Sequence, residues 1–333
     1  MSKLRRAVGW VFFSGSLLTH ILTVWCYARQ PDSLAAFTVM PFWFWGGIGL
    51  SLSVLAFYFL RAPLSLIVAA VWVVTLFVCM DEAKVLSNFS HPKLTMERKH
   101  PPGATKVLRV ATLNCAAFAF GNPTEDMKKW DPDIVLLQHV YPHQVKQMTE
   151  ALYGETGDYR ATGNNGIATR YKIRREVRNP LMRNQQVSIQ LPSGQEIEVA
   201  NVHLASAATD LRLWKSSSRT LHRSNRNLRR TELSAVLQVL DQASSFPGTP
   251  AILGGDFNAT ATDIVHRQLI RDFDDAFSKV GRGWGDTFHR RFPILRIDHI
   301  YATRQFQPQS CGVVVTKTTD HRMVIADYLL LGR

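Results

Sequence analysis

Acidic residues are scarce in this sequence, and cysteine is scarcer still. The 333 residues contain 26 Asp and Glu against 39 Lys and Arg, which gives a formal net charge of +13 at pH 7. Four cysteines in 333 residues are too few for a small disulfide scaffold. They include no Cys-x-x-Cys pair, which would be the usual signature of a zinc or redox motif. Apolar residues are plentiful at 46%, which excludes an intrinsically disordered chain.

Charged residues are almost absent from the first 80 positions. Three charge-free windows follow one another, at residues 7–28, 33–60 and 62–80. A helix needs roughly 20 apolar residues to cross the hydrocarbon core of a bilayer. We therefore predict a membrane anchor over 1–80 with three transmembrane helices, at about 7–28, 38–60 and 62–80.

The basic residues at the N-terminus predict the orientation of this anchor. Lys3, Arg5 and Arg6 hold the N-terminus in the cytoplasm by the positive-inside rule, and three crossings place the following residues outside it. Two crossings would leave the same residues in the cytoplasm. The three basic residues also fit a cleaved signal peptide, but cleavage would leave two further apolar spans. We expect a multi-pass protein of the cell membrane with an extracytoplasmic domain.

Residues 81–106 are polar and contain His-Pro-Pro-Gly at 100–103, which is typical of a linker. From residue 107 onward, short apolar runs typical of buried strands follow, at 107–113, 133–138, 195–204, 251–254, 297–302 and 323–331. Helices are expected at 142–153 and 220–243. Strands that alternate with helices indicate one α/β domain over 107–333.

Polar side chains follow these strands at the points where the strands end. They are Asn114, His139, His203, Asp256, Asn258, Asp298, His299, Asp320 and His321. A sheet fixes the positions of side chains at its edge, so this pattern is typical of an α/β active site.

The same segments resemble the endonuclease/exonuclease/phosphatase superfamily, the deoxyribonuclease I-like proteins. The matching motifs are LRVATLN, DIVLLQ, NVHL, GDFN, RIDHI and TDH, which occur in the superfamily's order across roughly 107–331. The resemblance implies a four-layered α/β/β/α sandwich of two mixed sheets with helices outside. It also implies hydrolysis of phosphate esters with a divalent metal, Mg²⁺ or Mn²⁺.

The resemblance implies a role for each residue of these motifs. His321 would be the general base that takes a proton from the attacking water, and Asp298 would orient its ring. Asp256 would orient the water, and His203 would protonate the leaving group. The Asn258 amide would bind the phosphate, whose negative charge grows in the transition state.

The metal ligands are where this sequence departs from the superfamily. Asn114 is expected to bind near both the metal and the phosphate, and Asp320 is a candidate metal or water ligand. His139 occupies the place of the Glu that is the superfamily's main metal ligand. Imidazole suits Mn²⁺, Fe²⁺ or Zn²⁺ better than Mg²⁺. The preferred metal is therefore changed, or binding is weak, or the site is degenerate and the protein only binds its ligand.

Residues 211–231 contain no acidic side chain, and six basic ones recur every three or four positions. On a helix this spacing predicts one basic stripe, which is either a contact for a polyanion or a solvated face. The candidate contacts are Arg219, Arg223 and Arg226. Because the domain is basic, nucleic acid is the first expected substrate and a phospholipid headgroup the alternative, and no obligate protein partner is expected.

Overall fold

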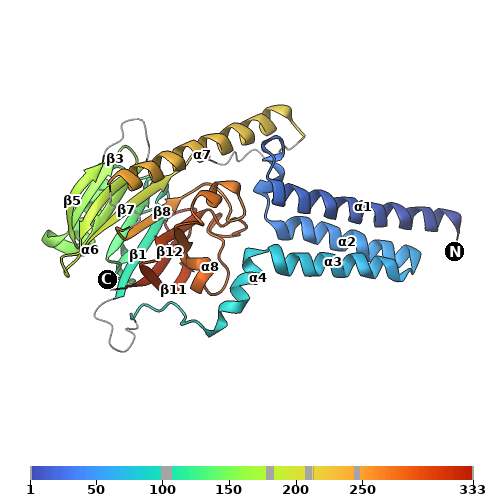
Figure 1. Ribbon diagram of the computed structural model, residues 1–333, viewed down its shortest axis with the longest axis horizontal. Helices are drawn as coiled ribbons and strands as arrows, with labels where there is room; N and C mark the ends of the chain where they lie inside the picture. Colours follow the sequence, from blue (N-terminus) through green and yellow to red (C-terminus); the bar gives the residue numbers. More distant parts are fainter. Residues whose placement is uncertain are drawn as a thin grey trace. The chain divides into compact units, whose positions relative to one another are not determined.

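The computed structural model describes residues 2–98, 107–177, 184–206, 212, 214–243 and 248–331 (Figure 1). The chain forms two compact units. The first contains residues 1–84 and 208–224, and the second contains 85–207 and 225–333. The expected linker at 81–106 contains a short helix, α4 (Asp81–Val85), and a 3₁₀ turn, Leu86–Ser90, while its His-Pro-Pro-Gly stretch lies outside the described residues.

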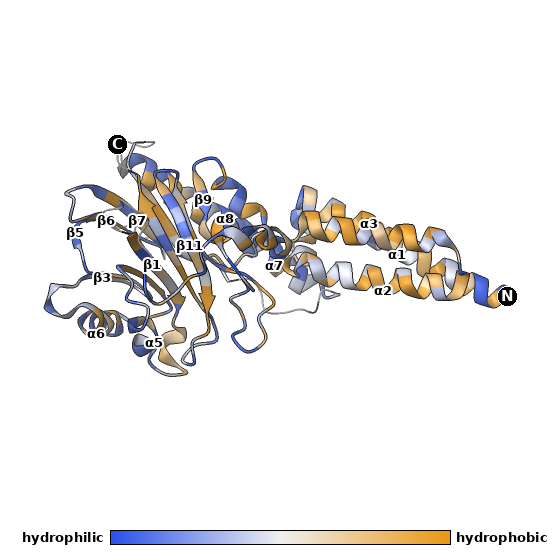
Figure 2. Ribbon diagram, turned by 90° about the horizontal axis from the view of Figure 1, so that it is seen from below, coloured by the Kyte–Doolittle hydropathy of each residue, from blue (hydrophilic) through white to orange (hydrophobic). Residues whose placement is uncertain are grey.

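The first unit contains three apolar helices, α1 (Lys3–Arg29), α2 (Phe42–Leu60) and α3 (Pro63–Cys79). Hydrophobic residues dominate all three (Figure 2). Among the described residues, α1 and α2 are each long and apolar enough to cross a membrane, and α3 gives a third span if it is joined to the bent continuation Asp81–Ser90. These lengths and compositions indicate association with a membrane.

Small and polar side chains pack these helices together. A Cβ atom on Gly49 of α2 would lie 2.0 Å from the Trp72 ring of α3, so only glycine permits this approach. Trp72 Nε1 donates to Ser16 Oγ of α1 at 3.1 Å, and Ser16 Oγ lies 2.8 Å from Ser53 Oγ of α2. Small residues and interhelical hydrogen bonds are the usual means by which helices associate in lipid.

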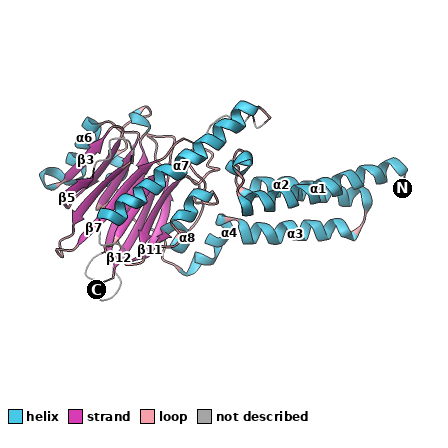
Figure 3. Cartoon of the chain, turned by 45° about the horizontal axis from the view of Figure 1, so that its top comes forward, coloured by secondary structure: helices cyan, strands magenta, loops and turns pink. Residues whose placement is uncertain are grey.

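Two six-stranded sheets form the second unit (Figure 3). The first has the order β11 (Phe306–Val314), β12 (Met323–Leu330), β1 (Val107–Asn114), β2 (Ile134–Gln138), β4 (Asn165–Thr169), β3 (Asp158–Thr162). The second has the order β5 (Lys172–Val177), β6 (Gln185–Gln190), β7 (Glu196–His203), β8 (Ala251–Asp256), β10 (Asp298–Thr303), β9 (Phe273–Asp275). Strands β1 and β2 pair in parallel, as do β7 and β8, and the other pairs are antiparallel.

Helices cover the outer faces of the two sheets. Helix α6 (Pro142–Tyr153) packs Val145 and Met148 on the outer face of the first sheet, and α7 (Ser216–Ala243) packs Leu233 and Leu240 on the second. The inner faces share one apolar core. The predicted α/β/β/α sandwich is therefore confirmed, with the short helices α5 (Thr124–Lys128) and α8 (Ala276–Val280) added to it.

All six predicted strands are present, and six more were not predicted: β3, β4, β5, β6, β9 and β11. Helix α6 has the predicted bounds, while α7 begins at Ser216, four residues before the expected start.

A buried hydrogen-bond network joins the two sheets beneath the strand ends. Gln138 Nε2 at the end of β2 donates to Asn201 Oδ1 of β7 at 2.6 Å, and Asn201 Nδ2 donates to the carbonyls of Leu137 and Gly166. Both side chains are fully buried. Buried polar groups must be satisfied, so this network fixes the ends of β2 and β7 relative to each other.

Candidate active site

The strand register brings the predicted polar residues to one end of the sandwich. Asp298 of β10 pairs with Asp256 of β8, and His203 of β7 pairs with Asp256 from the other side. Gly255 makes this close pairing possible. Its φ is +140°, and a Cβ atom there would lie 2.0 Å from the Val202 carbonyl oxygen.

Asp256 is the centre of the site and is 1% exposed. Its Oδ2 accepts a hydrogen bond from Asn114 Nδ2 of the first sheet at 2.9 Å. Its Oδ1 accepts from the backbone N–H of Asn258 at 2.8 Å. The Asn258 amide itself donates to the Leu204 carbonyl. Asp256 therefore joins the two sheets at the site.

Two histidines face Asp256. His321 Nδ1 lies 2.9 Å from Asp298 Oδ2, and its Nε2 lies 3.9 Å from Asp256 Oδ2. His203 Nε2 lies 3.8 Å from the same oxygen. A carboxylate behind one ring nitrogen holds the tautomer and orientation that leave the other nitrogen for chemistry.

The local electrostatics shift the pKa values of His321 and Asp256. Burial lowers the pKa of His321, but the charge and hydrogen bond of Asp298 outweigh burial and raise it to about 9. Burial, followed by the negative charge of Asp298, raises the pKa of Asp256 to about 6. Such shifts mark functional sites more often than ordinary surface pairs.

The carboxylates also suit a divalent cation. Among the described residues, ligand atoms of Asp256, Asp298 and His321 lie within 4.8 Å of one another. Asp298 Oδ1 is buried and has no hydrogen-bond partner, and hard cations prefer such oxygens. The residues present therefore fit a metal ion.

The other predicted metal ligands lie around this group. Asn114 contacts it through Asp256. His139 is exposed, has φ +48°, and its ring centroid lies 6.3 Å from that of His203. Asp320 is half-buried, and its Oδ1 lies 3.4 Å from Thr319 Oγ1. Neither His139 nor Asp320 belongs to the three-residue group.

The predicted basic stripe is wrong at Arg226. This arginine is fully buried, and its Nε lies 3.3 Å from Asp263 Oδ2, with Arg229 at 3.7 Å from the same oxygen. Arg219 and Arg223 are exposed, as predicted. The buried arginines lower the pKa of Asp263 against the effect of burial, and they hold the segment that follows Asn258.

His299 forms a pair behind the site with His266, which was not predicted. His266 and His299 both place Nε2 within hydrogen-bond distance of the Ala259 carbonyl, at 3.3 and 3.2 Å, and Tyr301 Oη lies 2.9 Å from His266 Nδ1. Burial, and then the neighbouring His299, lower the pKa of His266 to about 3, so its ring is neutral. This cluster supports the turn from Asp256 to Ala259. No sequence motif indicates a role for His266 or Tyr301.

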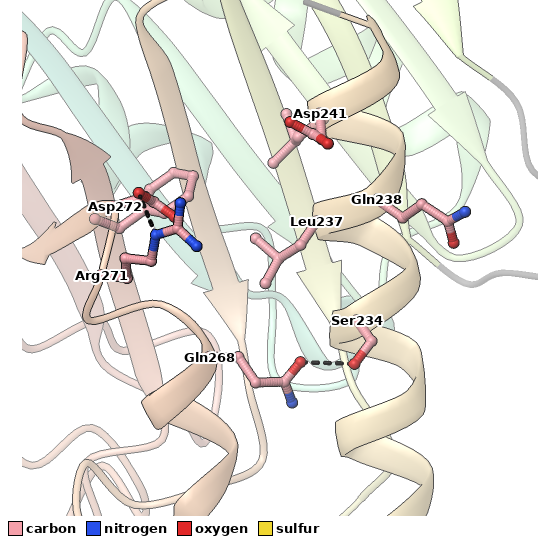
Figure 4. Close-up of a pocket in the computed structure, with 9 residues that line it drawn as sticks. Ser234, Leu237, Gln238, Asp241, Gln268, Arg271 and Asp272 are labelled. Carbon is pink, nitrogen blue, oxygen red and sulfur yellow. Dashed lines mark hydrogen bonds and ion pairs between the residues drawn. The ribbon is translucent and has the colours of Figure 1, made fainter. Parts of the chain in front are cut away.

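A cavity of about 610 Å³ lies elsewhere, between α7 and the segment before β9 (Figure 4). Ser234 Oγ donates to Gln268 Oε1 at 2.7 Å, and Arg271 pairs with Asp272 at 3.6 Å. None of the predicted site residues lines this cavity. The cavity is therefore separate from the group of Asp256, Asp298 and His321.

Residues 111–321 match the model of the Endonuclease/Exonuclease/phosphatase family. The chain belongs to this family. It is therefore a hydrolase of phosphoric ester bonds, in a family that generally depends on a divalent metal. No curated protein matches the sequence significantly.

Solved structures share the fold. An endonuclease/exonuclease/phosphatase from Bacteroides vulgatus is 19% identical, with a TM-score of 0.53 over 68% of this chain and 100% of that one. The mannosyl-6-phosphatase of Bacteroides thetaiotaomicron VPI-5482 is 19% identical, with a TM-score of 0.52 over 66% and 99%. D. rerio TDP2 complexed with single strand DNA product is 16% identical, with a TM-score of 0.51 over 67% and 98%.

In protein stripped of divalent metal, the His321 ring is expected to titrate near pH 9. Below that pH both ring nitrogens carry a proton and the ring is positively charged, and above it the ring is neutral with one proton. Asp298→Asn removes the charge that raises the pKa, so the titration should move to lower pH. NMR of the histidine Cε1–Hε1 resonances measures both values, and His321→Gln identifies the resonance. An unchanged pKa in Asp298→Asn would contradict the assigned pairing.

Proposed function

We propose that this protein is a membrane-anchored, metal-dependent phosphodiesterase that uses His321 as its general base. The observation that carries the proposal is the buried group of Asp256, Asp298 and His321, which holds a base and two carboxylates within 4.8 Å of one another. A base and carboxylates that can hold a metal ion are able to activate water against a phosphate ester.

Each site residue has one step in the proposed reaction. The neutral form of His321, which is the minor form below about pH 9 in the metal-free protein, takes a proton from water at Nε2. Asp256 orients that water, and the resulting hydroxide attacks phosphorus. The bond from phosphorus to the leaving oxygen breaks, and His203 gives that oxygen a proton. Asn114 and Asn258 position the phosphate. A divalent cation supplies charge stabilisation of the phosphoryl oxygens when it is bound.

Nucleic acid is the proposed substrate, because the chain carries a net charge of +13 and basic proteins attract polyanions. The similarity to D. rerio TDP2 with its single strand DNA product is in keeping with this choice. A phospholipid headgroup or another phosphate ester is the alternative, favoured by helices that are long and apolar enough to cross a membrane and by the fold shared with a mannosyl-6-phosphatase.

The test is hydrolysis by the full-length protein in detergent, with Mg²⁺ and Mn²⁺ compared. A single-stranded oligonucleotide, a phospholipid and bis(p-nitrophenyl) phosphate should be offered in parallel. Turnover of the generic diester establishes the reaction, and the ratio of the other two establishes the substrate. Absence of turnover with every substrate and metal would support a binding protein whose metal site is degenerate at His139.

His139→Glu is expected to raise the activity supported by Mg²⁺ relative to that supported by Mn²⁺. The change restores an oxygen ligand that a hard cation prefers, while the native imidazole favours softer ions. The His139 side chain is exposed, so the exchange should leave the fold intact. The measurement is kcat/KM for the generic diester with each metal.

His143→Glu provides the matched control, because His143 is also exposed, on α6. It should leave the Mg²⁺ to Mn²⁺ ratio unchanged. If His139→Glu also leaves that ratio unchanged, His139 does not contact the metal and the altered-metal proposal is wrong.

We propose that α1, α2 and α3 cross the membrane and place the catalytic unit outside the cytoplasm. Lys3, Arg5 and Arg6 at the N-terminus support this topology. A fluorescent reporter that matures only in the cytoplasm should show no fluorescence when it is fused to the C-terminus. The same reporter should fluoresce when it is fused to the N-terminus. A bright C-terminal fusion would show two crossings and a cytoplasmic catalytic unit.

A further inference from the structure

Residues 282–292, here named the arginine–aromatic loop, expose large apolar side chains next to positive charge. Phe292 is 76% exposed and Trp284 is 49% exposed. Arg291 beside Phe292 is exposed, and Arg282 and Arg290 are partly so. The acidic residue of the loop, Asp286, is buried. The loop therefore presents a positive surface with two aromatic side chains.

The loop is bound firmly to the general base. Phe288 forms a backbone bridge with His321, and the two ring centroids lie 5.0 Å apart. Arg322 Nε and Nη2 donate to the Arg290 carbonyl at 3.1 and 2.8 Å, and the Arg290 N–H donates to the Asp320 carbonyl at 2.7 Å. Whatever binds the loop is therefore held close to the catalytic histidine.

The chain that enters the catalytic unit is attached to the start of this loop. Asn88 Nδ2 donates to the Gly281 carbonyl at 3.2 Å, and Arg282 Nη1 donates to the His91 carbonyl at 3.2 Å. Helix α3 is capped at Met80. The eight Cα–Cα steps from Met80 to Asn88 span at most about 28 Å when fully extended, and this limit holds for any arrangement of the two units.

We propose that the arginine–aromatic loop docks onto the interfacial region of a bilayer that contains anionic lipids. Tryptophan and phenylalanine favour the interface between headgroups and acyl chains. Arginine is attracted to anionic headgroups. A nucleic acid also offers negative charge, but the short segment from Met80 to Asn88 keeps the start of the loop near the membrane helices and so favours the bilayer. The inference rests on the proposed membrane anchor, with α3 as its last span, and is independent of catalysis.

The test uses the full-length protein reconstituted into vesicles of phosphatidylcholine with about one third phosphatidylglycerol. A fluorophore is attached to Phe292→Cys, and lipids with a nitroxide at the headgroup serve as quencher. Ile270→Cys is the matched control, because Ile270 is an apolar side chain of similar exposure at 67% on another segment of the catalytic unit. Labelled wild-type protein gives the background from the four native cysteines.

Quenching at position 292 should exceed that at position 270 by about threefold or more, and it should fall in vesicles of phosphatidylcholine alone. Adding Arg291→Glu to Phe292→Cys should weaken the quenching, because a repulsive charge replaces an attractive one. Equal quenching at the two positions overturns the proposal. Lipid quenching absent at 292, together with a spectral shift there on adding a single-stranded oligonucleotide, overturns it in favour of nucleic acid.

Turnover of bis(p-nitrophenyl) phosphate by the same samples in detergent separates this inference from the proposed function. Quenching at position 292 without turnover would support the docking surface and contradict the proposed phosphodiesterase activity. Turnover without stronger quenching at position 292 than at position 270 would support the proposed enzyme activity and contradict the docking surface.

Discussion

Replacing His321 by alanine is expected to lower kcat for a phosphodiester by roughly 10²- to 10⁴-fold, the usual contribution of a general base. The residue is placed for this task by Asp298 at 2.9 Å on one side and faces Asp256 at 3.9 Å on the other. The measurement is single-turnover hydrolysis at saturating metal, which isolates the chemical step from product release.

Two further variants make the result interpretable. His321 is buried, and alanine would leave the Asp298 carboxylate without its hydrogen bond, so some loss of stability is expected. His321→Gln keeps a hydrogen-bonding side chain and should be equally inactive with a smaller change in Tm. His143→Ala, which removes an exposed histidine, should keep full activity. Near-full turnover in a folded His321→Ala protein would show that another group is the base.

Replacing Arg109 by methionine is expected to cost about 3 to 5 kcal/mol of stability, because it leaves a buried carboxylate unpaired. Arg109 of β1 is 0% exposed and donates to both oxygens of Asp327, at 2.6 and 2.8 Å. It also donates to the carbonyls of Thr95, Met96 and Trp130. One side chain thus joins β1, β12 and the segment that leads into the catalytic unit.

Thermal unfolding of the full-length protein in detergent measures this effect, with a fall in Tm of roughly 10 °C expected for a domain of this size. Arg271→Met is the matched control, because Arg271 has an 89% exposed side chain and its loss should change stability by less than about 0.5 kcal/mol. Equal Tm values for the two variants would show that the buried network contributes little.

The apolar pattern of the sequence determined the central strands of both sheets. Strands such as β1 and β2 are buried along their whole length, so their residues form mainly apolar runs that can be recognised in the sequence. Strand β5, with the sequence KIRREV, and the half-buried β3 were missed. They lie at sheet edges, where burial is partial and the apolar signal is weak.

The motifs at the strand ends also included the residues of the buried group that the structure brings together. The resemblance to the superfamily implied that Asp256, Asp298 and His321 act in one site. The distance of each side chain from Asp256 was not in the sequence, because it depends on the register between β7, β8 and β10. His266 and Tyr301 were likewise invisible, since they meet at the Ala259 carbonyl only after the chain has folded.

Arg226 shows most clearly what could not be predicted from the sequence. A spacing of three or four residues determines that arginines share one side of a helix, but it does not determine which way that side faces. The packing of α7 on the second sheet decides this, and it buries Arg226 and Arg229 against Asp263 while leaving Arg223 exposed. The sequence by itself determined the family, the central strands and the kinds of chemical groups present. Only the tertiary structure decided which of these groups are buried, paired and close enough to act together, because burial and pairing depend on contacts between residues far apart in the chain.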